Sequence, residues 1–149
     1  MRRIPVGSRH AACVKRLAQL LFQAAQGRLI VSVQNPIYLG KYAEVQPDLA
    51  LLRAQPDFYA AALPAPADVF LVVEVGDTTA EYDRQVKLPL YALAGIPEVW
   101  LVDLNAQALE VYRSPVPEGY GQRLLPRRDE VLSLPDLPDV ALKVRDILA

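Results

Sequence analysis

The chain has 149 residues, of which 52% are hydrophobic and 22% charged, so it is a globular protein with its own core rather than a disordered one. Its only cysteine, Cys13, excludes an internal disulfide and a cysteine-based zinc site, and any triad or multi-histidine metal site would have to be built around its only histidine, His10. No apolar run approaches the ~20 residues of a membrane helix and no secretory signal pattern is present, so we expect no membrane association and a cytoplasmic location.

The charge is distributed unevenly. Residues 1–43 hold seven of the sixteen basic residues and none of the seventeen acidic ones. A basic face beside an acidic centre suits a polyanion and a metal site, although a solvated basic helix face explains the pattern equally well. The arginine-rich start would also suit a mitochondrial transit peptide, but the helix caps and the strands that follow favour a folded part of the domain.

The first elements expected in chain order are a helix and three strands. Ser8 can cap a helix over residues 9–26 that Gly27 closes, and apolar residues at helical spacing should face the core: Val14, Leu17, Leu21 and Ala24. At the start of this helix we interpret His10 as a surface histidine. Strands are predicted over residues 28–33, 37–39 and 45–53.

The middle of the chain predicts a buried strand followed by a helix. After a proline- and alanine-rich connection, residues 69–75 are predicted to form a strand, and its unbroken apolar run over 69–73 is typical of a strand covered on both faces. Thr78 and Glu81 form a capping-box pattern, and Gly95 marks a helix end. Pro89 lies inside this helix, so we expect a kink or a late start near Asp83.

The remaining elements complete a mixed architecture. Strands are predicted over residues 98–103, 108–113, 119–126 and 130–134, and a short helix over 144–148. The second of these strands should pair with the first across a short turn. The fold class is therefore α/β or α+β, one domain over residues 1–149 with a mixed central sheet flanked by helices.

Two carboxylates lie at the ends of apolar strands. Asp48 comes just before "LALL", and Glu74 comes late in the next long strand. If these strands pair antiparallel, Asp48 and Glu74 meet at one edge of the sheet, where a divalent cation would relieve their repulsion. Oxygen ligands favour magnesium or manganese over zinc. The alternative is that one or both carboxylates point to solvent.

Lys87 can complete this constellation. If the helix begins near Asp83, Lys87 lies only ~6 Å along the helix axis from the sheet edge, and its ammonium can reach the two carboxylates. If the helix begins near Thr79, this distance is ~12 Å and the ammonium reaches them less easily. The alternative role is a surface i,i+4 ion pair between Lys87 and Asp83.

The segments "VQPDLALL", "FLVVEV", "YDRQVKLPLYALAGIPEVWLVD" and "LEVYR" together resemble the Uma-two family of restriction-endonuclease-like proteins, in the PD-(D/E)XK nuclease superfamily. The resemblance extends from Gly7 to the end. It implies a restriction-endonuclease-like fold, Asp48 and Glu74 as metal ligands, and the backbone carbonyl of Val75 as a third ligand. Two departures stand out: the superfamily lysine position is Gly76, so Lys87 would take its role, and the N-terminus is shortened relative to similar sequences.

The leading hypothesis is a magnesium- or manganese-dependent DNA endonuclease. Asp48 and Glu74 would hold the cation, and Lys87 would orient or deprotonate the attacking water or stabilise the phosphate. Asp77 and Asp83 are candidates to support the metal from outside its coordination sphere, although helix capping and solvation explain them as well. Candidate phosphate contacts come from the first helix: Arg9, Lys15 and Arg16.

Other functions remain open at this point. A homodimer would suit cleavage of both strands. The rival hypothesis is a non-catalytic DNA- or protein-binding scaffold with the same fold, which Gly76 and the shortened N-terminus favour. A third is an interaction domain that exposes Trp100 and Tyr112, although the apolar "EVWLV" indicates that Trp100 belongs to the core.

Overall fold

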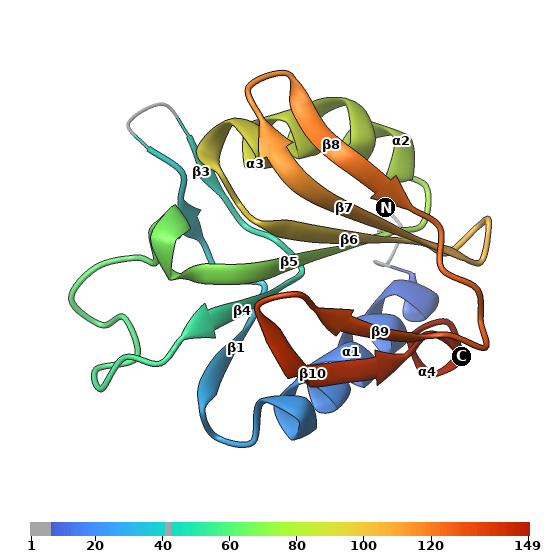
Figure 1. Ribbon diagram of the computed structural model, residues 1–149, viewed down its shortest axis with the longest axis horizontal. Helices are drawn as coiled ribbons and strands as arrows, with labels where there is room; N and C mark the ends of the chain where they lie inside the picture. The colour runs from blue at the N-terminus through green and yellow to red at the C-terminus, as the bar shows by residue number, and fades with distance from the viewer. Residues whose placement is uncertain (1–6, 41–42) are drawn as a thin grey trace, which may run out of the picture.

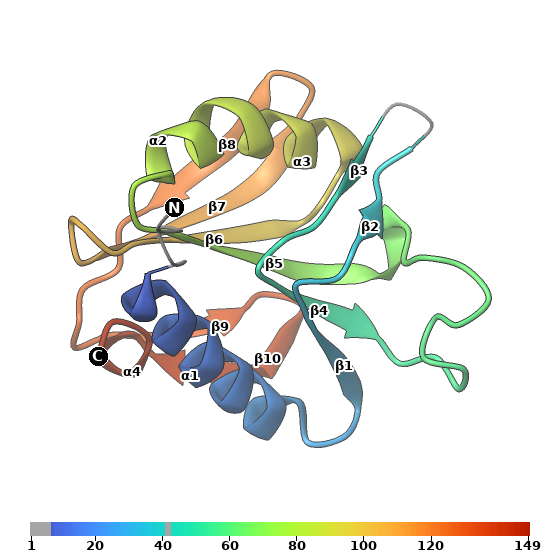
Figure 2. The same ribbon diagram turned by 180° about the vertical axis from the view of Figure 1, so that it is seen from behind.

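A six-stranded sheet runs through the centre of the protein, with helices and a small hairpin on its faces (Figures 1 and 2). The structure is a computed structural model that describes residues 7–40 and 43–149. The central strands are β1 (Leu29–Val33), β4 (Leu49–Arg53), β5 (Val69–Gly76), β6 (Glu98–Asp103), β7 (Ala108–Val116) and β8 (Gly119–Leu124), in the order β1-β4-β5-β6-β7-β8. Only β5 and β6 pair parallel, so the predicted mixed sheet flanked by helices is confirmed.

Two smaller sheets accompany the central one. β2 (Ile37–Tyr38) pairs with β3 (Glu44–Val45), and β9 (Val131–Leu134) pairs with β10 (Leu137–Lys143), both antiparallel. β10 was not predicted from the sequence, because Pro138 interrupts a run of alternating residues that otherwise suits a strand. No helix within residues 7–40 and 43–149 is long and apolar enough to cross a membrane.

The two faces of the sheet carry separate apolar clusters. α1 (Ser8–Ala25), the β9–β10 hairpin and α4 (Val144–Ile147) cover one face, where Leu71, Val73 and Val75 of β5 are buried. The helical segment between β5 and β6 covers the other face, where Val72 is buried (Figure 2). Side chains alternate along a strand, so Glu74 projects to the same face as Val72, toward that helical segment.

The first helix is capped differently from the prediction. Gly7 is the N-cap and Ser8 is already the first helical residue, so the Ser8 hydroxyl makes no cap hydrogen bond. The helix ends at Ala25, and Gln26 and Gly27 follow in the left-handed region with φ of 51° and 72°. The predicted end of the helix at Gly27 is therefore correct to within two residues. Glycine suits this position because it adopts the left-handed conformation of the helix end without steric cost.

The helix after β5 contains a wide turn. It consists of α2 (Ala80–Tyr82), a π-helical segment η2 (Asp83–Lys87) and α3 (Leu88–Ala94), joined by residues in helical conformation. Of the two predicted alternatives, the late start near Asp83 is wrong, because the helix begins at Ala80, and an interruption of the regular helix over Asp83–Lys87 takes its place. Pro89 lacks an amide hydrogen and its ring would clash with the carbonyl of Gln85 in a regular α-helix, and the wider π turn just before it relieves this clash.

The ends of this helical segment also differ in part from the prediction. Its N-cap is Thr79 and no side chain caps it, so the predicted capping box of Thr78 and Glu81 does not form. The Glu81 carboxylate instead accepts hydrogen bonds from Arg84 and Gln85. Gly95 closes the helix with φ of 82°, as predicted.

The strand β6 is buried along its whole length, which excludes one of the proposed functions. Trp100 is fully buried and Tyr112 is 8% exposed. A binding face that exposes these two side chains is therefore wrong. Their apolar rings belong to the two core clusters on opposite faces of the sheet.

Candidate active site

Asp48 and Glu74 lie side by side at one edge of the central sheet. β4 and β5 pair antiparallel with Leu49 opposite Val73, so the next positions outward are Asp48 and Glu74. The Asp48 amide donates to Glu74 Oε1 at 3.4 Å, and the Val75 amide donates to Asp48 Oδ2 at 2.8 Å. The backbone of each strand thus fixes the carboxylate of the other, and the antiparallel pairing that the sequence suggested is confirmed.

Glu74 is a deeply buried acid. Its side chain is 3% exposed, and Tyr91 Oη of α3 donates a hydrogen bond to Oε2 at 2.5 Å. Burial raises the pKa of Glu74 to about 7, although Lys87 and the Tyr91 hydrogen bond act against this rise. The space enclosed by Glu74, Lys87 and Tyr91 has no room for a water molecule. A carboxylate kept in such a setting therefore carries a free-energy cost when it is ionised.

Lys87 reaches the carboxylates from the π turn. Its Nζ lies 3.4 Å from Glu74 Oε2 and 3.8 Å from Asp83 Oδ1. Lys87 therefore makes the i,i+4 pair with Asp83 and also lies beside the carboxylate pair, through its contact with Glu74. Burial lowers the pKa of Lys87, but the nearby carboxylates outweigh it and the net pKa is raised. Lys87 is consequently a cation at neutral pH.

An arginine-centred cluster anchors the segment that carries Lys87. Arg84 Nη2 lies 2.6 Å from Glu110 Oε2 and 2.7 Å from Asp103 Oδ2, on β7 and β6. Hydrogen bonding to Glu110 raises the pKa of Arg84. Because Arg84 is three residues before Lys87, these contacts hold the π turn against the sheet and limit where the lysine can point. The sequence reasoning did not identify this cluster, because its three members are far apart in the chain.

His10 belongs to the candidate site, so its interpretation as an ordinary surface histidine is wrong. Its Nε2 lies 3.2 Å from Asp48 Oδ1, and both side chains are 16% exposed. The other ring nitrogen, Nδ1, is buried without a hydrogen-bond partner among the described residues. No local sequence signal revealed this contact, which depends on where α1 meets the start of β4.

The remaining predicted residues lie outside this group. Asp77 faces Arg9, with Oδ1 3.9 Å from Nη1, and is not brought to the carboxylate pair. Arg9 also donates to the Leu104 carbonyl at 2.7 Å. Arg16 donates to the carbonyls of Asp146 and Ile147, so its guanidinium fastens α1 to α4. Of the three basic candidates for DNA contacts, Lys15 has an exposed side chain with no hydrogen bond or ion pair to the described residues.

The oxygen atoms offered by the predicted metal ligands are of the kind that bind a hard divalent cation. Asp48 and Glu74 supply carboxylate oxygens from adjacent strands, and Val75, whose carbonyl is the third predicted ligand, directly follows Glu74. Within the part of the chain that the structure describes, no three His, Cys, Asp or Glu side chains already surround a common point for a metal. His10 and Lys87 instead lie against the two carboxylates, His10 on Asp48 and Lys87 on Glu74.

Comparison with known proteins places the chain in a family described as nuclease-like. Residues 2–145 match the family model Uma2, which is described as "Putative restriction endonuclease". No curated protein matches the chain. A crystal structure described as "a putative nuclease belonging to DUF820", from Anabaena variabilis, has a TM-score of 0.70 with 13% sequence identity. The match covers 99% of this chain and 84% of that one, and at this identity it shows a shared fold alone.

Proposed function

The chain belongs to the Uma2 family of restriction-endonuclease-like proteins, and we propose that it is a metal-dependent endonuclease that hydrolyses DNA phosphodiester bonds. The observation that supports this most directly is the meeting of three side chains at one sheet edge. Asp48 and Glu74 are adjacent through the β4–β5 register, and Lys87 lies 3.4 Å from Glu74. A carboxylate pair with a nearby ammonium provides negative charge to hold a cation and positive charge to receive a phosphate.

Asp48, Glu74 and the Val75 carbonyl would hold the cation, which we propose to be magnesium or manganese. When bound, such an ion supplies Lewis-acid polarisation of the phosphate and a more acidic water. Asp48 is kept in place by the Val75 amide and by His10, and Glu74 by Tyr91. The pKa of about 7 for Glu74 makes cation binding compete with a proton, so we expect affinity to rise from pH 6 to pH 8.

Lys87 would act as a positive charge and not as a base. Its raised pKa keeps the ammonium protonated at neutral pH, so it favours stabilisation of a developing negative charge on phosphate oxygens. Asp83, 3.8 Å away, would keep the ammonium over the site. Of the roles considered for this lysine, electrostatic stabilisation or orientation of the water has more support than proton abstraction.

We propose that basic side chains of α1 contribute to the DNA-binding surface. Lys15 and Arg9 of α1 are the exposed candidates for phosphate contacts, although Arg9 also donates to the Leu104 carbonyl. Arg16 is the weaker candidate, because its donors are used internally. We further propose a single nuclease-like domain over residues 1–149, and a homodimer as the form suited to cutting both strands.

The second candidate function is a non-catalytic scaffold that binds DNA or protein. Two observations favour it: Gly76 stands where the superfamily carries its lysine, and the described residues contain no ready group of three metal ligands. A Cβ at residue 76 would lie 2.7 Å from the Ala80 Cα, so a lysine cannot replace this glycine without a shift of α2.

Calorimetric titration of magnesium and of manganese separates these functions. We expect saturable binding by the native protein, none by Glu74→Gln, and native behaviour by the control Glu44→Gln, which alters an exposed carboxylate. Cleavage of supercoiled plasmid should follow the same pattern. Absence of binding in the native protein, both alone and with a short DNA duplex, would favour the scaffold.

A further inference from the structure

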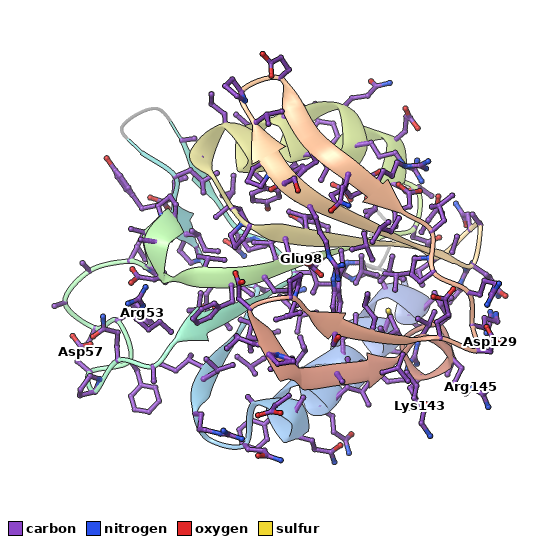
Figure 3. The ribbon with its side chains drawn as sticks, viewed as in Figure 1. Arg53, Asp57, Glu98, Asp129, Lys143 and Arg145 are labelled. Atoms are coloured by element: carbon purple, nitrogen blue, oxygen red, sulfur yellow. The ribbon has the colours of Figure 1, made fainter. Side chains whose placement is uncertain are left out.

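A second cavity lies at the opposite end of the sheet from the carboxylate pair. It has a volume of about 260 Å³ and lies where the loop between β9 and β10 faces the beginnings of β5 and β6. Figure 3 shows Glu98, at the start of β6, in this region between the central sheet and the β9–β10 hairpin. Glu98 and Asp103 are the two ends of β6, about 16 Å apart at ~3.3 Å per residue. This cavity is therefore separate from the candidate active site.

The base of the cavity is a buried ion pair. The Glu98 side chain is 3% exposed, and its Oε1 accepts from Arg113 Nε at 2.7 Å. Trp100 Nε1 donates to Glu98 Oε2 at 2.7 Å. Desolvation of two such charges commonly offsets their attraction, so a buried pair is poorly explained by stability alone. A role in binding would account for charged groups at the end of an otherwise apolar strand.

Arg113 offers unused hydrogen-bond donors to this cavity. Its Nε and Nη2 bind Glu98, and Nη2 also donates to the Ser133 carbonyl at 2.9 Å. Nη1 makes no hydrogen bond to the described residues, and it is not among their buried unsatisfied atoms. A guanidinium has five N–H groups, so the two on Nη1 remain available for a ligand, and Arg113 is one of the residues that line the cavity.

The backbone beside Arg113 is strained at the same wall. Ser114 has φ of 60°, which is unusual for a residue other than glycine. Opposite it, a Cβ at Gly121 would lie 3.2 Å from the Ser114 carbonyl oxygen, so a side chain there would crowd this wall. Strained residues of this kind concentrate at ligand sites, where the surrounding structure maintains them.

The walls and charges restrict the ligand. Phe70, Pro97, Leu134 and Leu137 supply apolar surface, and Asp136 is an exposed acid among the lining residues. Glu98 offsets the charge of Arg113, and Asp136 adds a negative charge, so an anion is disfavoured. The favoured ligand is uncharged and flat, with an acceptor for Arg113 and a donor for Asp136. The volume is slightly below the ~300–1,000 Å³ of pockets for drug-sized molecules, which suits one ring system.

We propose that this cavity binds a nucleobase, presented either by a free nucleoside or by an unpaired nucleotide of DNA. Nucleobases combine flat apolar faces with neighbouring acceptors and donors on one edge. The proposal does not depend on the carboxylate pair.

The single tryptophan of the chain provides the measurement. Trp100 shares the Glu98 carboxylate with Arg113, so a ligand on Arg113 should change its fluorescence. The four deoxynucleosides are titrated into the full chain with chelator present, and we expect a saturable change for at least one, with a Kd on the order of 0.1 mM. Calorimetry provides a second readout.

Two variants test the location of the binding. Gln122 lies opposite Arg113 on β8, so Gln122→Phe should fill the cavity and abolish binding. Asp136→Asn should weaken binding by about threefold or more by removing a charged acceptor. The matched control is Asp139→Asn, an exposed acid of the same hairpin outside the cavity, which should bind as the native protein does. Arg113 itself is not replaced, because Glu98 would be left buried without its partner.

A short single-stranded oligonucleotide containing the preferred base separates the two sources. Binding that the free nucleoside displaces identifies an unpaired DNA base, and binding of the nucleoside alone identifies a free nucleoside. The proposal is overturned if neither readout responds up to about 10 mM of any deoxynucleoside, a hundredfold excess over the expected Kd. It is overturned equally if Gln122→Phe binds normally. Either failure leaves the proposed endonuclease activity untouched.

Discussion

Replacing Glu74 by glutamine should remove a pH-dependent loss of stability. Burial raises the pKa of Glu74 from 4.5 to about 7, so between these values the folded protein holds a proton that the unfolded chain has released. The stabilisation from this proton is fully present below pH 4.5 and is lost as the pH rises through 7. The difference between the two pKa values corresponds to about 3 kcal/mol, at about 1.4 kcal/mol for each pKa unit.

The assay is thermal or urea unfolding of the native protein and Glu74→Gln from pH 5 to pH 8, with chelator present. From pH 5 to pH 8, the free energy of unfolding of the variant should rise relative to that of the native protein by about 3 kcal/mol. This corresponds to roughly 10 °C in Tm for a chain of this size. Glu44→Gln, which changes an exposed carboxylate, should follow the native curve. Parallel curves for the native protein and Glu74→Gln would refute the reasoning, because they would mean that Glu74 titrates normally.

Four other substitutions, one of them also combined with Asp48→Asn, test the remaining contacts. Lys87→Met should reduce DNA cleavage by about 100-fold or more. Cation binding measured by calorimetry should persist, because Glu74 keeps its carboxylate oxygens and loses only the lysine ammonium that competes for them. Loss of cation binding would contradict this role of Lys87. Arg16→Gln should lower the free energy of unfolding by about 1–2 kcal/mol without changing the salt dependence of DNA binding, whereas Lys15→Gln should leave stability unchanged and reduce the salt slope by about one. His10→Ala should lower the free energy of unfolding by about 1 kcal/mol. A double-mutant cycle with Asp48→Asn that shows no coupling would argue against the contact between His10 and Asp48.

The carboxylate pair could be predicted because both parts of it are encoded locally. Each acid adjoins an apolar run, and strands that follow one another in sequence tend to be neighbours in the sheet, so antiparallel pairing brings Asp48 to Glu74. Lys87 was predicted to lie near the same edge from helix geometry, with either a kink or a late helix start near Asp83. A π turn, and not a late helix start, brings it there, because Pro89 loosens the hydrogen bonding of the preceding turn.

Contacts between distant segments could not be read from the sequence. His10 meets Asp48 only because the first turn of α1 lies near the start of β4, and Arg84 meets Glu110 only because β7 is placed beside β6. Neither pair has a spacing that a helix or hairpin would enforce. Arg16 shows the same limit, because its position on a polar helix face suggested DNA, whereas its donors reach α4 at the other end of the chain.

The packing of α1 against the last elements has a consequence for synthesis on the ribosome. Arg16 binds carbonyls of Asp146 and Ile147, and one core cluster combines residues from α1 with others from β10 and α4. The apolar side of the first helix therefore cannot be fully covered until residue 147 has left the exit tunnel. At roughly 5–20 residues per second, this side stays uncovered for several seconds in every nascent chain, the period in which chaperone binding or aggregation competes with folding.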